Sequence, residues 1–225
     1  MNFVSLKSGT SVAGEEITAF RSEKKSSTYV YLMAGTHGDE VEGVYILKEL
    51  FAWLQGPVEI EASFIVIPIL NVDGYRARTR VNSHGVDLNR NYPSESWSAE
   101  AREAKYSPGA KPLSEPENVY LDKLFKKFPP HLIISLHSWK PFINFNGNCE
   151  QIAQFLAKHN DYEIMGEIEG HPTPGSLGDY GPQKYNSPVL TFECPVLSDE
   201  LDLKAIYAQN ESAFKNLLQS DLIKA

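Results

Sequence analysis

Four apolar runs stand out along the chain, and Gly, Pro, Asn or Asp bounds each of them. They cover residues 28–35, 63–70, 131–137 and 188–193. All four are rich in β-branched and aromatic residues, which favours β-strands. Their residues are apolar at both alternating positions, so neither face of such a strand is suited to water. The pattern therefore predicts a central sheet that is covered on both faces.

Elsewhere, apolar residues recur every three or four positions, which is typical of amphipathic helices. The predicted helices cover residues 39–55, 114–128, 149–159 and 198–219, with Ser114 and Ser198 as expected N-caps. The alternation of strands and helices predicts an α/β fold, a three-layer α/β/α sandwich around a mixed, mostly parallel sheet. Residues 9–20 are expected to form an edge hairpin that turns at Ala13 and Gly14.

Three polar segments are too long to be simple connections. They cover residues 71–94, 95–113 and 166–187. Long loops inside a compact domain are usually functional or disordered, and loops that border a rigid sheet usually carry recognition. We expect the second and third segments to form the walls of a binding site.

Composition and charge narrow the class of protein. The 225 residues fit one domain over 1–225, and 42% hydrophobic with 22% charged residues is typical of a globular protein. The net charge of −8 disfavours nucleic acid or an anionic membrane as partner. No apolar run reaches the ~20 residues that cross a bilayer, and the first residues lack a signal-peptide pattern. The two cysteines favour a reducing, cytoplasmic location.

Three of the predicted strands end on, or lead directly to, an ionisable side chain, namely His37, His137 and Glu193. In open α/β sheets ligands bind at the carboxyl ends of the strands, so these groups are expected to meet. Glu40 follows His37 by three residues, which places both on one side of a helical turn. Two histidines and a glutamate are a known ligand set for catalytic zinc. The alternative is an ordinary strand-to-helix turn with polar caps.

A second polar motif is GVDLNRNY at 85–92. Its Asn89 and Arg90 suit the planar, bidentate grip on a carboxylate that lysine cannot provide. The alternative is a solvated loop with an incidental ion pair. The first interpretation is favoured because the stretch is short, polar and flanked by Gly85 and Pro93.

Taken in order, five short motifs resemble those of the zinc carboxypeptidase family. They are His-x-x-Glu at 37–40, NVDGYR at 71–76, GVDLNRNY at 85–92, SLHS at 135–138 and TFE at 191–193. Each motif is weak alone, but five in order at compatible spacing are specific. LSEPE at 113–117 and HPTPGSLGDY at 171–180 further resemble the bacterial murein peptide amidase branch of that family.

The resemblance implies a zinc-dependent hydrolase with one Zn²⁺ per chain, bound by His37, Glu40 and His137. Asp87 would orient a ligating imidazole. Glu193 would act as general base and acid toward the zinc-bound water that attacks the amide. The implied substrate is a small murein peptide, cleaved between γ-D-glutamate and a terminal meso-diaminopimelate that carries a free carboxylate.

The same resemblance assigns roles around the scissile bond. Arg80 would stabilise the developing oxyanion. Asn89 and Arg90 would hold the terminal carboxylate, and Ser138 would line the non-leaving side.

Two residues in the third polar segment bear on specificity. His171 stands where relatives carry a mobile tyrosine, and its imidazole is expected to donate a hydrogen bond to the bound carboxylate. Asp179 lies in the loop that forms the leaving-group pocket of relatives, where it would attract the far ammonium of diaminopimelate. The alternative for Asp179 is a turn cap after Gly178.

Three other functions stay open. They are a general metallocarboxypeptidase acting on α-peptides, an aspartoacylase-like deacylase of N-acyl amino acids, and a binding module without chemistry. The deacylases share GTHG-x-E and DLNR, but NVDGYR and TFE fit the carboxypeptidases better. All candidate ligands and Glu193 are intact, which disfavours the binding module.

Overall fold

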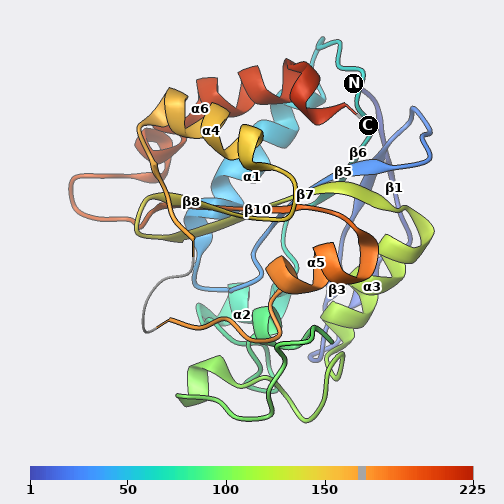
Figure 1. Cartoon of the computed structure of the whole chain (residues 1–225), viewed down its shortest axis with the longest axis vertical. Coiled ribbons are helices and arrows are strands. Elements are labelled where there is room, and N and C mark those ends of the chain that lie inside the picture. Colours follow the sequence, from blue (N-terminus) through green and yellow to red (C-terminus); the bar gives the residue numbers. More distant parts are fainter. Residues whose placement is uncertain (167–170, 225) are drawn as a thin grey trace.

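The computed structural model describes residues 1–166 and 171–224, and eight strands in these residues form one mixed sheet (Figure 1). The strands are β1 (Phe3–Ser5), β4 (Phe20–Ser22), β5 (Tyr29–Ala34), β6 (Phe64–Ile67), β7 (Pro130–Trp139), β8 (Phe142–Asn146), β9 (Glu163–Ile164) and β10 (Val189–Pro195). Their order is β1-β4-β6-β5-β7-β10-β8-β9. The central strands β6, β5, β7 and β10 are parallel, whereas β1–β4, β4–β6 and β10–β8 pair antiparallel.

Helices cover both faces of this sheet. On one face lie α1 (Val41–Leu54), α4 (Glu150–Asn160) and α6 (Leu203–Gln219); on the other lie α2 (Val72–Ala77), α3 (Pro116–Lys127) and α5 (Leu177–Tyr185) (Figure 1). Short 3-10 helices are η1 (Leu88–Arg90), η2 (Ala104–Tyr106) and η3 (Asp221–Ile223). No helix among the described residues is long and apolar enough to cross a membrane. The helices on both faces of the mixed sheet confirm the predicted three-layer α/β/α sandwich.

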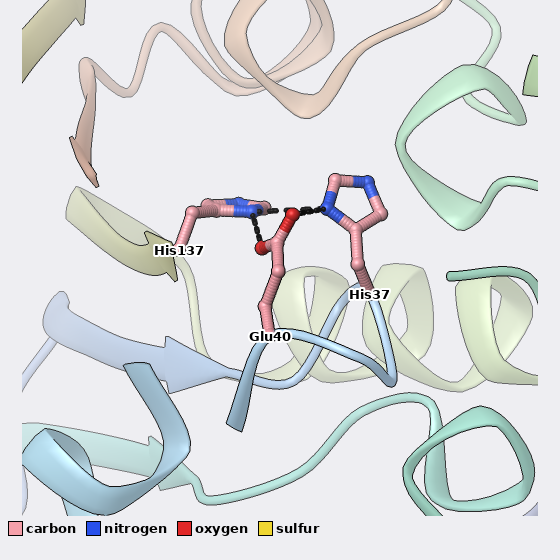
Figure 2. A group of neighbouring side chains, drawn as sticks. All are labelled: His37, Glu40 and His137. Atoms are coloured by element: carbon pink, nitrogen blue, oxygen red, sulfur yellow. Dashed lines mark hydrogen bonds and ion pairs between the residues drawn. The ribbon is translucent and has the colours of Figure 1, made fainter. Parts of the chain in front are cut away.

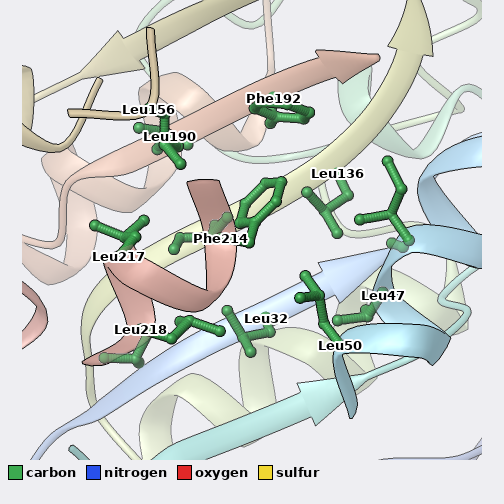
Figure 3. Packing of buried hydrophobic residues seen from close by; sticks show 14 of the residues in the cluster. Leu32, Leu47, Leu50, Leu136, Leu156, Leu190, Phe192, Phe214, Leu217 and Leu218 are labelled. Atoms are coloured by element: carbon green, nitrogen blue, oxygen red, sulfur yellow. The ribbon is translucent and has the colours of Figure 1, made fainter. Parts of the chain in front are cut away.

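The buried strand β5 shows how the sequence divides the core. Every residue of β5 is buried, and its side chains alternate between two hydrophobic clusters. Leu32 packs in the cluster that contains Leu50 of α1 and Leu218 of α6 (Figure 3). Tyr31 points to the other face, where its ring meets Phe125 of α3 edge-on at 4.9 Å. Apolar residues at both alternating positions are thus explained by two apolar layers.

The structure adds elements that the apolar pattern did not predict. Strand β8 is short and interrupted by asparagines, and α5 contains Gly178, Gly181 and Pro182, all poor helix formers. Residues 71–94 and 166–187 were expected to be loops, but they contain α2 and α5; residues 167–170 lie outside the described part. The hairpin of β2 (Gly9–Thr10) and β3 (Glu16–Ile17) exists, but as a separate two-stranded sheet.

Two predicted helix starts were wrong. The helix expected from residue 198 begins at Leu203, where Asp202 accepts a hydrogen bond from Ala205 N at 2.8 Å. The expected cap Ser114 instead donates its hydroxyl to Glu115 at 2.7 Å. Helix α6 is thus capped by a later polar residue, whereas the N-cap residue of α3, Glu115, makes no side-chain capping bond and Pro116 begins the helix.

A buried carboxylate, Asp122 of α3, fastens α5 to this face. Its Oδ1 accepts hydrogen bonds from Tyr180 at 2.7 Å and Tyr185 at 2.5 Å. Asp122→Ala is expected to lower the free energy of unfolding by about 2 kcal/mol, because two hydroxyls lose their acceptor. Urea denaturation measures this loss. Lys126 pairs with Asp122 but is 62% exposed, so Lys126→Ala is the control and should cost less than about 0.5 kcal/mol.

The stabilisation by Asp122 should depend on pH. Burial opposes ionisation, but the hydrogen bonds from its three partners outweigh it and lower the pKa of Asp122. A carboxylate with a lowered pKa in the folded state stabilises above its unfolded pKa and loses that contribution as the pH falls. The difference between parent and Asp122→Ala should therefore shrink in acid. An unchanged difference would contradict this account.

Candidate active site

The carboxyl ends of three parallel strands bring the predicted site residues together. His37 follows β5 after a turn at Gly35, whose φ of 64° favours glycine. His137 lies near the end of β7, and Glu193 of β10 is its direct partner in the parallel register. Alternation along β7 and β10 turns both side chains toward the face that carries α5. The strand ends meet at one edge, as the sequence predicted.

His37, Glu40 and His137 form a compact group in which both imidazoles face the carboxylate (Figure 2). His37 Nδ1 lies 2.6 Å from Glu40 Oε1, and His137 Nδ1 lies 2.7 Å from Glu40 Oε2. The two Nδ1 atoms are 3.2 Å apart. Both histidines are 3% exposed. Glu40 stands at the N-cap position of α1 but makes no side-chain capping bond, so its carboxylate serves the histidines.

The chemistry of this group fits a metal ion. Asp87 Oδ1 lies 3.1 Å from His37 Nε2 and accepts its N–H. His37 Nδ1 faces the Glu40 carboxylate, and a metal ion that replaced the proton between them would bind the Nδ1 lone pair. His137 Nε2 is likewise engaged, by Ser135 Oγ at 2.9 Å. Two ligands on one tetrahedral ion lie roughly 3.3 Å apart at metal–nitrogen distances of ~2.0–2.1 Å, close to the observed Nδ1 separation. The buried His-Glu-His group therefore indicates a metal site.

Asp87 connects the histidine to the arginine that the motifs singled out. Arg80 donates from Nε to Asp87 Oδ2 at 3.0 Å, and its Nη1 lies 3.4 Å from Glu40 Oε1. Although burial opposes it, the cationic neighbours His37 and Arg80 hold the pKa of Asp87 well below its usual range. Arg80 therefore lies beside the His-Glu-His group, with Nε and Nη2 held by Asp87 and Nη1 directed toward Glu40.

Asp87→Asn is expected to weaken metal binding about 10- to 100-fold, because an amide orients the imidazole less firmly and does not raise its basicity. Competition with a chromophoric chelator measures this affinity. Asp39→Asn is the matched control, since Asp39 is an exposed carboxylate next to Glu40 in the chain. An equal loss in both variants would mean that net charge matters and the contact with His37 does not.

Glu193 is a half-buried acid beside the histidines. Its Oε2 is shielded from solvent and has no hydrogen-bond partner among the described residues. Burial, reinforced by the Glu40 carboxylate, raises the pKa of Glu193 to about 8. A carboxyl group with this pKa can exchange a proton near neutral pH, as a general base and acid must.

Arg90 is buried at 6% exposure, and among the described residues no carboxylate pairs with it. Its Nη1 donates only to the backbone oxygen of Asn89, at 2.7 Å. Burial lowers the pKa of Arg90, and Arg80 adds to this effect. The Asn89 side chain accepts from Leu177 N at 2.9 Å and so fixes the start of α5. A buried guanidinium of this kind suits an anionic ligand.

The three remaining predicted site residues lie elsewhere. Ser138 follows His137, so alternation turns it to the opposite face of β7, where it donates to Glu42 Oε2 at 2.6 Å. His171 is exposed, and its Nδ1 lies 3.1 Å from Arg102 Nη2. Asp179 is in the first turn of α5 and accepts from Ser96 Oγ. This geometry does not favour Ser138 as a lining residue, and it gives His171 and Asp179 no contact with the metal group.

The loop that carries His37 is locked against α2. A Cβ atom at Gly38 would lie 1.9 Å from the carbonyl carbon of Gly74, and one at Gly74 would lie 2.7 Å from Val81 O. Gly38 N also donates to Arg80 O at 3.3 Å. The NVDGYR motif at residues 71–76 therefore packs directly against the loop that carries His37.

Sequence reasoning missed two residues at the site. Ser135 lies two positions before His137, so strand alternation could have placed it on the same face. Tyr106 of η2 contacts both site arginines through its ring, at 5.2 Å from Arg80 Cζ and 5.7 Å from Arg90 Cζ. Nothing in the polar segment 95–113 distinguished this tyrosine from a solvent-exposed one.

The mixed sheet, which carries the His-Glu-His group and the half-buried Glu193 at its strand ends, has a carboxypeptidase-like fold. Carboxypeptidase A from Helicoverpa armigera superposes with a TM-score of 0.79, covering 98% of this chain and 68% of that one, at 18% identity. That likeness supports the fold.

More similar proteins narrow the class. Murein peptide amidase A from Escherichia coli K12 is 30% identical over 212 residues, which are 89% of this chain and 85% of that protein. The crystal structure of the murein-tripeptide amidase of Escherichia coli O157 superposes with a TM-score of 0.75 at 26% identity, covering 94% and 90% of the two chains. The chain belongs to the murein peptide amidase A family, within the zinc carboxypeptidases.

A model of the succinylglutamate desuccinylase/aspartoacylase catalytic domain also matches, over residues 26–132. That stretch contains His37, Glu40 and Asp87 but ends before His137 and Glu193. The two families share the first part of the site, as GTHG-x-E and DLNR indicated. The protein is therefore a hydrolase of the metallopeptidase and amidase type.

Proposed function

We propose that the protein is a zinc-dependent amidase that hydrolyses the γ-D-glutamyl–meso-diaminopimelate bond of small murein peptides. The observation that carries this proposal is the buried Arg90, which has no carboxylate ion-pair partner among residues 1–166 and 171–224, in a chain that also gathers His37, Glu40 and His137. A terminal diaminopimelate carries a free carboxylate, which would be the ion-pair partner of Arg90. The names of the murein peptide amidase relatives support the same substrate class.

His37, Glu40 and His137 would hold Zn²⁺ through two Nδ1 atoms and the carboxylate. The ion would supply a Lewis acid that polarises the amide carbonyl and makes water a better nucleophile. Asp87 keeps His37 in the tautomer that presents Nδ1. With two neutral imidazoles and one carboxylate, the Zn²⁺ site would keep a net positive charge. This charge would stabilise the negative charge that develops on the carbonyl oxygen.

Glu193 would move the proton. Its unpartnered Oε2 would accept a proton from the attacking water, and the same oxygen would deliver it to the nitrogen of the departing diaminopimelate. Arg80 would stabilise the negative charge on the carbonyl oxygen with the part of its guanidinium that Asp87 does not hold. Arg90 would bind the carboxylate next to the scissile bond, and Asn89 would fix the wall formed by α5.

We also propose a cytoplasmic location. Cys149 and Cys194 are both free and buried, as expected for a chain that folds under reducing conditions.

The deacylase alternative stays relevant because of the match over residues 26–132. An N-acyl amino acid also presents a carboxylate beside an amide, so Arg90 alone does not separate the two functions. A general carboxypeptidase would likewise use the same group on α-peptides.

The test is direct cleavage by zinc-loaded protein, with products identified by mass spectrometry. The substrates are L-Ala-γ-D-Glu-meso-diaminopimelate, a hippuryl dipeptide and an N-acetyl amino acid. Release of free diaminopimelate from the first substrate alone is expected. Cleavage of only the hippuryl dipeptide or only the N-acetyl compound would overturn the proposal.

A further inference from the structure

Tyr106 of η2 is surrounded by positive charge. Its ring centroid lies 4.2 Å from Arg102 Cζ and 5.1 Å from Lys105 Nζ, in addition to its contacts with Arg80 and Arg90 at 5.2 and 5.7 Å. Each of these distances is short enough for a cation–π contact. We call the four cations around Tyr106 the cationic ring. It stands out in a chain whose net charge is −8.

The cationic ring has an inner and an outer half. Arg80 and Arg90 are largely buried, and Arg80 is paired with Asp87. Arg102 and Lys105 are exposed on the segment 95–113, where Lys105 faces Glu103 at 3.3 Å and Arg102 approaches His171. The outer half therefore leads from solvent to the buried Arg90.

Holding four cations near one ring has an electrostatic cost. Burial does most to lower the pKa of Arg90, and the Asp87 carboxylate opposes this effect. The positive charges of Arg80 and Arg102 lower it further, so Arg90 is repelled by cations in both halves of the cationic ring. The π face of Tyr106 offsets part of this repulsion, because its negative quadrupole attracts each cation. A bound anion would offset more of it, and the buried Arg90 accounts for only one carboxylate.

We propose that Arg102 and Lys105, held around Tyr106, form a second carboxylate subsite beside Arg90, so the preferred substrate carries two carboxylates near the scissile bond. The inference rests on the proposed function and deepens it. A murein peptide offers two candidates: the α-carboxylate that a γ-linkage leaves free on D-glutamate, and the far carboxylate of diaminopimelate. An ordinary α-peptide with apolar side chains offers neither. The subsite would thus select the murein peptide by charge.

The test compares kcat/KM for three peptides. The parent is L-Ala-γ-D-Glu-meso-diaminopimelate. In L-Ala-γ-D-isoglutaminyl-meso-diaminopimelate the α-carboxylate is an amide, and in L-Ala-γ-D-Glu-L-Lys the far carboxylate is absent. The wild-type protein should cleave one of these analogues about tenfold less efficiently than the parent, the lower end of what a charge-assisted hydrogen bond contributes. The analogue affected identifies which carboxylate is bound.

Arg102→Gln and Lys105→Gln identify the residues that bind it. Each should lose about tenfold in kcat/KM on the parent peptide and show little further loss on the affected analogue, because the charge contact is already gone. Tyr106→Leu should reproduce this selective loss. Lys158→Gln, an exposed lysine on α4, is the control and should match the wild type on all three peptides. Equal wild-type rates on the three peptides, or equal losses by the variants on all of them, would overturn the subsite.

Binding separates this inference from the proposed function. Glu193→Gln protein, which should not turn over, can be titrated calorimetrically with the same three peptides. Weaker binding of one analogue without any wild-type cleavage would support the subsite and overturn the amidase function. Cleavage of all three peptides with equal affinity would support the amidase function and overturn the subsite. Neither binding nor cleavage would overturn both.

Discussion

Glu193→Gln is expected to lower kcat roughly 10²–10⁴-fold while the metal content and the fold stay unchanged. Glutamine has the same shape as glutamate, but its amide cannot accept a proton from water and return it to an amine. Oε2 of Glu193 is shielded and has no hydrogen-bond partner among the described residues, so no group bonded to it can take over the transfer. KM should change little, since Arg90 carries the contact with the substrate carboxylate.

The control for this variant is thermal stability. Glu193 is half-buried, and the loss of hydration raises its pKa to about 8, so replacing the carboxyl group with a neutral amide should cost no stability at neutral pH. We expect the variant to melt no lower than the parent and to hold one metal ion per chain by mass spectrometry. A kcat within tenfold of the parent would show that another group moves the proton.

His137→Ala is expected to abolish stoichiometric metal binding and to lower activity roughly 10⁴-fold or more, because it removes a Lewis acid worth several kcal/mol. Two of the three ligand atoms would remain, His37 Nδ1 and the Glu40 carboxylate. Two protein ligands are too few to hold a catalytic zinc ion, which normally takes three. Elemental analysis of dialysed protein measures the metal, and the murein peptide assay measures the activity.

His131→Ala is the matched control because His131 lies at the other end of the same strand. Its Nε2 contacts Ile223 O at 2.9 Å, far from the metal group. The variant should keep its metal and most of its activity, although it can lose some stability. If His137→Ala kept one metal ion per chain, or if both variants lost it, the assignment of His137 as a ligand would fail.

The sequence predicted the central layers well because burial on both faces leaves a strong pattern. The run 28–35 became β5 over Tyr29–Ala34, and the periodic stretch 39–55 became α1 over Val41–Leu54. The site followed from the same logic, since parallel strands deliver their carboxyl ends to one edge. His37, Glu40 and His137 were thereby predicted to meet from positions about a hundred residues apart, and the structure places them together.

What the pattern missed depends on packing across the molecule. Helix α5 contains Gly178 and Pro182, and it forms because Ser176 caps it and α3 anchors its tyrosines. The role of Ser138 was inferred from its neighbour in sequence, whereas a strand places adjacent side chains on opposite faces. Tyr106 could not be singled out because its arginine partners, Arg80, Arg90 and Arg102, lie at separate places in the sequence.

The contact between Gly38 and Gly74 limits how this site can change. A Cβ at Gly38 would collide with the backbone of Gly74, so a substitution there would displace the neighbouring His37. A Cβ at Gly74 would collide with the Asn71 side chain and with Val81 O, so a substitution there would disturb the segment against which Gly38 packs. Variation in what the enzyme recognises is therefore expected at the outer rim, at exposed positions of the segment 95–113. Directed evolution of new substrates should begin there and keep both glycines fixed.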